Sequence, residues 1–122
     1  MPTIRLVAYR EHDGTVPLRD WLDGLEEKAR NKCLVRLQRL EQLGHELRRP
    51  EADILRDGIH ELRARHRRVN YRMLYFFHGQ EMVIVSHCII KQQAQVPPRE
   101  IDLAISRRQS FDRNPDQHTF TG

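Results

Sequence analysis

The sequence predicts a single α+β domain with a mostly antiparallel sheet. Strand-like and helical segments occur in runs instead of alternating along the chain, which favours this fold class over a doubly wound parallel sheet. The 122 residues are enough for one hydrophobic core but not for two. A chain with 39% hydrophobic and 31% charged residues is expected to be globular rather than disordered.

The N-terminal part is expected to form a strand followed by a helical hairpin. Residues 3–9 alternate in polarity as a strand does, and Pro17 suits the first turn of a short helix. A longer helix is expected over residues 26–43, with Gly44 as its C-terminal cap. The apolar residues that recur at helical spacing in it are Ala29, Cys33, Leu37 and Leu40.

The C-terminal part is expected to form a three-stranded antiparallel meander and a last helix. Residues 47–54 contain Pro50 and few apolar side chains, and are expected to be a connector. The strand-like segments that follow, rich in β-branched and aromatic residues, are 59–64, 69–77 and 82–90. A polar loop at 92–95 and a helix beginning at Pro97-Pro98 complete the domain. The helices are expected to cover one face of the sheet.

Domain boundaries follow from the loss of periodicity near the C-terminus. Residues 1–111 are expected to form the domain, and residues 112–122 a flexible tail. No apolar run approaches the ~18 residues that a membrane span needs, and no signal peptide opens the chain, so a cytoplasmic protein without a membrane partner is expected.

Positive charge is concentrated in the predicted meander. Residues 56–72 contain six arginines and two acidic residues, whereas the whole chain has a net charge of +4. Arginine outnumbers lysine 18 to 3. Because the guanidinium group binds phosphate through two parallel hydrogen bonds, this excess favours phosphate or nucleic acid as a partner. Arginine-rich coding bias is the alternative for the overall ratio, but it does not explain the local excess.

Known catalytic and metal-binding motifs are absent from the sequence. There is no CxxC, HExxH, GxSxG or phosphate-binding glycine loop, so neither a metal nor another cofactor is expected. Two cysteines within apolar patterns, Cys33 and Cys88, are expected to be buried free thiols. What remains is metal-independent chemistry on a phosphate, with cations that stabilise charge in the transition state.

The candidate catalytic residues lie on the predicted meander. Arg63, Arg72 and Lys91 can converge on one face as a cationic cluster without nearby carboxylates. His87 lies four residues before Lys91, on the same strand face, and can act as general base or acid. The alternative is that each cation pairs separately, Arg63 with Glu61 or Asp57, Arg72 with an acid from the helices and Lys91 with solvent, and that His87 is a core residue. Arginines expected to contact the RNA backbone are Arg65, Arg67, Arg68, Arg99, Arg107 and Arg108.

Several sequence runs together resemble a known toxin family. The runs are LRDGIHELR (55–63), YRMLYFF (71–77) and HCIIKQQ (87–93), followed by Pro97, Glu100-Ile101 and Ala104. They are similar to the phage-derived HigB-like branch of the RelE/ParE toxin superfamily, over roughly residues 15 to 108.

This resemblance implies a RelE-like α+β toxin of a type II toxin–antitoxin system, which cleaves mRNA at the ribosome and so inhibits translation. It implies a helix-turn-helix antitoxin from the same operon as partner, and it places the cationic site at Arg63, Arg72 and Lys91. Gln92 stands where many relatives have a second lysine, and no tyrosine follows Tyr75. The alternatives are a ParE-like toxin that poisons DNA gyrase without cutting RNA, and a basic nucleic-acid-binding module.

Overall fold

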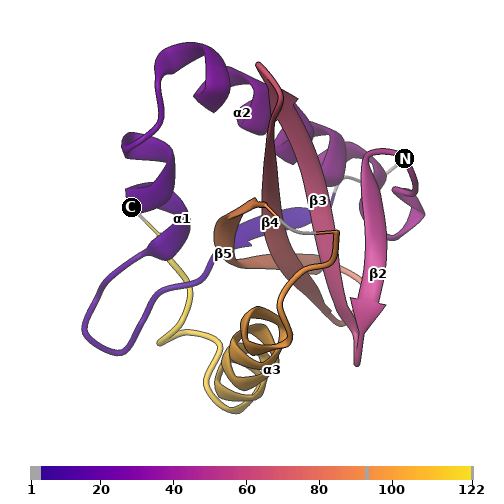
Figure 1. Cartoon of the computed structure of the whole chain (residues 1–122). Coiled ribbons are helices and arrows are strands. Elements are labelled where there is room, and N and C mark those ends of the chain that lie inside the picture. Colours follow the sequence, from indigo (N-terminus) through magenta and orange to yellow (C-terminus); the bar gives the residue numbers. More distant parts are fainter. Residues whose placement is uncertain (1–3, 93, 122) are drawn as a thin grey trace.

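The computed structural model describes residues 4–92 and 94–121, and it has the α+β architecture predicted from the sequence (Figure 1). Gln93, part of the expected polar loop, lies outside the described residues. The elements in chain order are β1 (Arg5–Ala8), α1 (Pro17–Asp23), α2 (Glu27–Leu43), the 3-10 turn η1 (Gly44–Glu46), β2 (Ala52–Arg56), β3 (Ile59–His66), β4 (Val69–His78), β5 (Met82–Lys91) and α3 (Pro98–Arg113).

A five-stranded sheet forms the centre of the domain, in the order β1-β5-β4-β3-β2. Strands β2 to β5 pair antiparallel, and β1 pairs parallel with β5 at one edge. The expectation of a connector over residues 47–54 is wrong in its last part, since β2 begins at Ala52. This strand was missed because it is short and, as an edge strand, exposes Ile54 and Arg56 instead of burying a continuous apolar face.

Helices cover both faces of the sheet, so the expectation that they cover one face is wrong (Figure 1). One hydrophobic cluster joins α1 and α2 to the sheet and includes Leu40 and Met73. A second cluster joins α3 to the other face and includes Phe76 and Phe111. Strand β4 is buried along both faces, because Tyr71, Met73 and Tyr75 alternate with Arg72, Leu74 and Phe76.

Two tight turns connect β2 to β3 and β3 to β4. Asp57 and Gly58 have φ values of 51° and 80°, and Asp-Gly is a favourable sequence for such a turn. Arg67 and Arg68 also have positive φ values, 50° and 69°, although neither is a residue type that adopts this conformation readily. The tip of the β3–β4 hairpin therefore holds two exposed arginines in an unfavourable backbone conformation.

The segment expected to be a flexible tail has defined contacts. Helix α3 continues to Arg113, and Thr119 then forms a bridge with Tyr9 beside β1. The ring of His118 stacks on the ring of Tyr9 at a centroid distance of 5.0 Å. The mobility of this segment in solution stays a prediction. Among the described residues, no helix is both long and apolar enough to cross a membrane.

Candidate active site: a basic groove on the α3 face

Strands β3, β4 and β5 place the predicted cations on the face that α3 covers. Arg63 and Arg72 are directly opposite each other in the β3–β4 pair. Arg72 precedes Leu74 by two residues and shares its face, and Leu74 packs in the cluster with α3. The main chain of Arg63 is fixed by two hydrogen bonds, from its N–H to the Glu51 carbonyl and from Arg36 Nε to its own carbonyl.

A buried carboxylate lies between the two arginines. Glu61 is only 3% exposed; its Oε1 lies 2.8 Å from Arg72 Nε, and its Oε2 accepts a hydrogen bond from Arg63 Nη2 at 3.2 Å. Arg63 Nη2 also donates to Asp53 Oδ2 at 3.2 Å. The expectation of a cationic cluster without nearby carboxylates is therefore wrong. Burial lowers the pKa of the Arg72 guanidinium, and the negative charge of Glu61 opposes this effect.

The hydrogen bonding at this cluster is incomplete. Arg72 Nε and Glu61 Oε1 form an ion pair at 2.8 Å, although the angles at this contact are not those of a well-aligned hydrogen bond. Of the four buried side-chain polar atoms without a hydrogen-bond partner among the described residues, three are here: Glu61 Oε1, Arg63 Nε and Arg72 Nε. Buried polar groups in proteins are nearly always satisfied, and exceptions are concentrated at sites that bind ligands or catalyse reactions. This cluster is thus suited to receive an anion with hydrogen-bonding groups.

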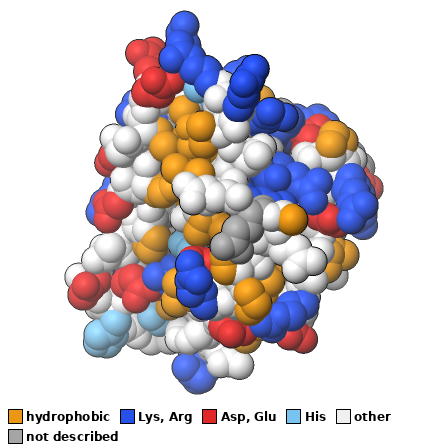
Figure 2. Space-filling view, viewed as in Figure 1, with side chains coloured by type: hydrophobic (Ala, Val, Ile, Leu, Met, Phe, Trp, Pro, Cys, Tyr) orange, Lys and Arg blue, Asp and Glu red, His pale blue; other side chains and the backbone are white. Residues whose placement is uncertain are grey.

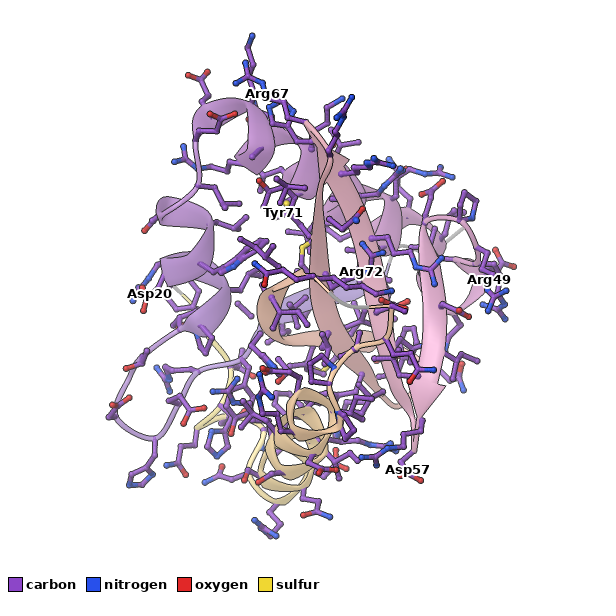
Figure 3. All side chains as sticks on the ribbon, in the orientation of Figure 1. Asp20, Arg49, Asp57, Arg67, Tyr71 and Arg72 are labelled. Atoms are coloured by element: carbon purple, nitrogen blue, oxygen red, sulfur yellow. The ribbon has the colours of Figure 1, made fainter. Side chains whose placement is uncertain are left out.

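The cluster borders an open groove with a volume of about 470 Å³. Its charged lining residues are Arg49, Asp53, Arg56, Glu61, Arg63 and Lys91. Figure 2 shows Lys and Arg side chains gathered over β2 and β3 on this side of the molecule. In Figure 3, Arg72 extends toward β3 and Arg49 lies at the outer edge beside β2. Arg72 is only 8% exposed and does not line the groove, so it lies beneath the groove floor.

Lys91, at the end of β5, belongs to the same groove as Arg63 and Glu61. It also borders a smaller pocket of about 120 Å³ that Arg99 lines from the start of α3. Arg99 is exposed and has only a 3.7 Å contact with the neighbouring Glu100 carboxylate. Both cations are thus positioned to contact a phosphate that enters the groove.

His87 has the strand position predicted for it, but it does not line the groove. A shift in register between β4 and β5 leaves Ser86 and His87 side by side under α3. The ring nitrogens of His87 contact Ser86 Oγ at 2.8 Å and Glu100 Oε1 at 3.0 Å. Burial and the Arg107 charge lower the pKa of His87, and Glu100 opposes the shift. These contacts hold the start of α3 against β5.

The arginines expected to contact RNA divide into two groups. Arg65, Arg67 and Arg68 are exposed at the β3–β4 hairpin. Arg107, by contrast, donates to Glu11 Oε1 at 2.7 Å and to the Ser86 carbonyl at 3.1 Å, and its guanidinium lies over the Tyr9 ring. Arg108 donates to the Asp57 carbonyl at 3.0 Å. The structure thus leaves the hairpin arginines free, whereas the α3 pair connects elements of the fold.

Asp53 is a site residue that was not predicted from the sequence, and Glu61 was predicted only as a partner of Arg63 in the alternative with separate pairs. Glu61 precedes Arg63 by two residues in one strand, so the two share a face, and this spacing was a signal for their pairing. Asp53 could not be placed, because β2 was not recognised as a strand. Among the described residues, no group of three or more His, Cys, Asp or Glu side chains could hold a metal ion.

Comparison with known proteins identifies the family. No curated protein matches the chain. A family model described as "Phage derived protein Gp49-like (DUF891)" matches residues 20–109, which include the end of α1, all of α2, strands β2 to β5 and most of α3. This match covers well over half of the chain and all the residues of the groove. The chain therefore belongs to the Gp49-like family of phage-derived proteins.

Proposed function

We propose that this protein is the toxin of a type II toxin–antitoxin system and a metal-independent endoribonuclease that cleaves mRNA at the ribosome in the cytoplasm. Membership of the Gp49-like family, whose members are toxin-like proteins of such systems, supports the toxin part of the proposal. The resemblance of the meander to HigB-like toxins supports mRNA as the substrate. A ParE-like toxin, which poisons gyrase without cutting RNA, would not need a groove lined by catalytic groups. The basic groove therefore favours the endoribonuclease.

One observation carries the catalytic part of the proposal. Arg63 Nε is a buried donor without a partner among the described residues, and it lies with the buried Arg72–Glu61 ion pair beside an open basic groove. An unpaired buried donor costs about 1–3 kcal/mol, so the buried Arg63 Nε is unfavourable for stability as long as nothing binds there. A phosphodiester, with its anionic oxygens, has acceptors that would satisfy it.

The reaction that we propose is attack by the RNA's own 2′-oxygen. Glu61, which lines the groove, accepts the proton of the 2′-hydroxyl, and the 2′-oxygen then attacks the adjacent phosphorus. Arg63, which also lines the groove, stabilises by direct contact the negative charge that develops on the phosphoryl oxygens. Arg72 contributes its charge from beneath the groove floor, where it is paired with Glu61. The bond to the 5′-oxygen breaks, and this oxygen takes a proton from the Lys91 ammonium group. The products are a 2′,3′-cyclic phosphate and a 5′-hydroxyl end.

His87 has a different role in this proposal. Because both of its ring nitrogens are occupied and its side chain does not line the groove, we assign it the positioning of α3 instead of proton transfer. Among the predicted RNA-binding residues, we retain Arg65, Arg67, Arg68 and Arg99.

Induced expression in bacteria tests the function. The wild-type protein should arrest growth and stop methionine incorporation before thymidine incorporation. Arg72→Ala should abolish the arrest, because it removes a charge that stabilises the transition state, at a cost of about 3 kcal/mol. Circular dichroism of the purified variant should show that it is still folded. Arg19→Ala is the matched control. Arg19 is an exposed arginine of α1, and neither it nor its helix contributes a residue to the groove. Earlier loss of thymidine incorporation would favour gyrase poisoning instead.

The partner that we propose is a helix-turn-helix antitoxin from the same operon. Helix α2 offers it an exposed apolar surface, with Leu34 and Val35 exposed by 39% and 53%. Arg36 and Arg39, on the same helix, are held by Glu51, with N–O distances of 3.4 Å and 3.0 Å. Docking at Leu34 and Val35 would leave the groove on the other face of the sheet open.

A further inference from the structure

The basic groove continues round the free edge of the sheet into a second pocket. Strand β2 is the edge strand, and Asp53 and Ile54 project to opposite faces of it. The second pocket has a volume of about 260 Å³ and is lined by Leu47, Arg48, Arg49, Asp53, Ile54 and His60. Arg49, Asp53 and Ile54 line both the groove and the second pocket. The two cavities thus form one path across β2.

Positive charge extends along the whole path. Five cations border the groove and the second pocket together, against two carboxylates, Asp53 and Glu61. The cations are Arg48, Arg49, Arg56, Arg63 and Lys91. One reacting phosphate needs only the cluster at Arg63. Of the cations beyond it, Arg49 is paired with Asp53, and Arg56 is paired with Asp57 and Asp102. Arg48 has no ion pair with a described residue and is therefore suited to a further phosphate of the same strand.

Apolar and aromatic surfaces accompany this charge. Ile54, on the crossing point, is 62% exposed, although it is a large apolar residue. At the far end, the His60 ring stacks on Tyr75 with a centroid distance of 5.1 Å and packs edge-to-face with Phe77. His45, whose Nε2 is the fourth buried polar atom without a partner, stacks on the same Phe77. Nucleobases bind to surfaces of this kind, with a ring for stacking and polar groups at its edge.

We propose that a single strand of RNA, continuing from the reacting phosphate, crosses β2 over Ile54 and places one base against His60 in the second pocket. A pocket of about 260 Å³ is slightly smaller than those of drug-sized ligands, about 300–1,000 Å³, and so suits one base. This inference rests on the proposed function, because it needs RNA in the groove. It adds a second contact region that reads the strand beyond the cleaved bond.

Binding of short RNAs to the full chain tests the path separately from the reacting site. The probes are a dinucleotide and a hexanucleotide, both 2′-O-methylated so that the nucleophile is blocked, and the readout is fluorescence anisotropy. Ile54→Ser and Arg48→Gln should each weaken hexanucleotide binding about fivefold or more, as expected for one base contact. Both should leave dinucleotide binding unchanged. Leu103→Ser, which alters an exposed leucine of α3, is the matched control and should change neither.

Three outcomes would overturn the path. The path is overturned if Ile54→Ser and Arg48→Gln leave hexanucleotide binding unchanged. That result would favour a protein strand as the partner that binds at the β2 edge. A wild-type protein that binds both RNAs equally well would refute the path while leaving the proposed function intact. Failure of the wild-type protein to bind either RNA would also refute the path, whereas the proposed function, which acts on mRNA at the ribosome, would then stand or fall with the growth-arrest assay.

Discussion

The β3–β4 hairpin tip gives a sharp prediction, because its two arginines are unfavourable for folding. Arg67 and Arg68 have φ values of 50° and 69°, and this left-handed conformation costs about 1–2 kcal/mol for a residue with a Cβ atom. Asn and Gly adopt it readily and are the favoured pair for such turns. The double substitution Arg67→Asn, Arg68→Gly should therefore stabilise the protein.

The expected magnitude follows from the two residues. Relief of strain at both positions is offset by the greater flexibility of Gly in the unfolded chain, about 0.5–1 kcal/mol. A net gain of about 1–2 kcal/mol remains, which corresponds to a rise in Tm of about 4–8 °C for a domain of this size. Differential scanning calorimetry measures this shift. The reasoning is refuted if Tm stays the same or falls.

The same substitution should weaken RNA binding. Each lost phosphate contact lowers the slope of log K against log salt by about 0.7 for a single strand, so two lost contacts lower it by about 1.4. Arg67→Lys, Arg68→Lys is the matched control, because it keeps both charges and the strained conformation and should change neither Tm nor the slope. An unchanged slope in the Asn-Gly variant would show that the hairpin tip is only a solvated turn.

Three further predictions concern stability, pH and the partner. Glu61→Leu leaves the buried Arg72 guanidinium without its carboxylate and should cost about 3–5 kcal/mol in urea unfolding, whereas Glu61→Leu, Arg72→Met should cost less; equal losses would contradict a coupled pair. Burial lowers the pKa of both His60 and His87, so the folded protein keeps them neutral while the unfolded chain takes up protons below about pH 6.5. The free energy of unfolding should therefore fall as pH is lowered from about 7 to about 5, and His87→Gln should flatten this dependence; a pH-independent free energy would refute the assignment. Val35→Asp should abolish the complex with the neighbouring operon product in gel filtration without changing RNA binding, and an intact complex would place the antitoxin elsewhere.

Most of the fold follows from local patterns in the sequence. The alternation in β4 and the helical spacing of Ala29, Cys33, Leu37 and Leu40 reflect burial, and all four of these α2 residues are buried. Strand β2 carries no such pattern, because an edge strand is stabilised by its neighbour and not by a buried face of its own. The position of α3 on the opposite face is equally non-local. It depends on the second apolar side of β4, where Phe76 meets Phe111.

The candidate site was predictable in its cations and not in its acid. Arg63, Arg72 and Lys91 share one face, as the two-residue period of strands requires. Which carboxylate enters the cluster depends on side-chain conformation, since Glu61 can turn either to Arg63 in its own strand or to Arg72 across the sheet. In the structure it contacts both. For His87, the two-residue period of the strand predicts the correct face of the sheet. It cannot predict that Glu100, from α3, contacts the Nε2 atom of the ring.

The chemistry of the RNA ends tests the central claim most directly. The purified protein is incubated with mRNA on programmed ribosomes and with free RNA, and the ends of any fragments are analysed. The proposed mechanism predicts 2′,3′-cyclic phosphate and 5′-hydroxyl ends, strong loss of cleavage in Glu61→Gln, and no cleavage where a 2′-deoxynucleotide precedes the scissile bond. Fragments with 5′-phosphate ends, cleavage that survives the 2′-deoxy substitution, or intact RNA under both conditions would contradict it.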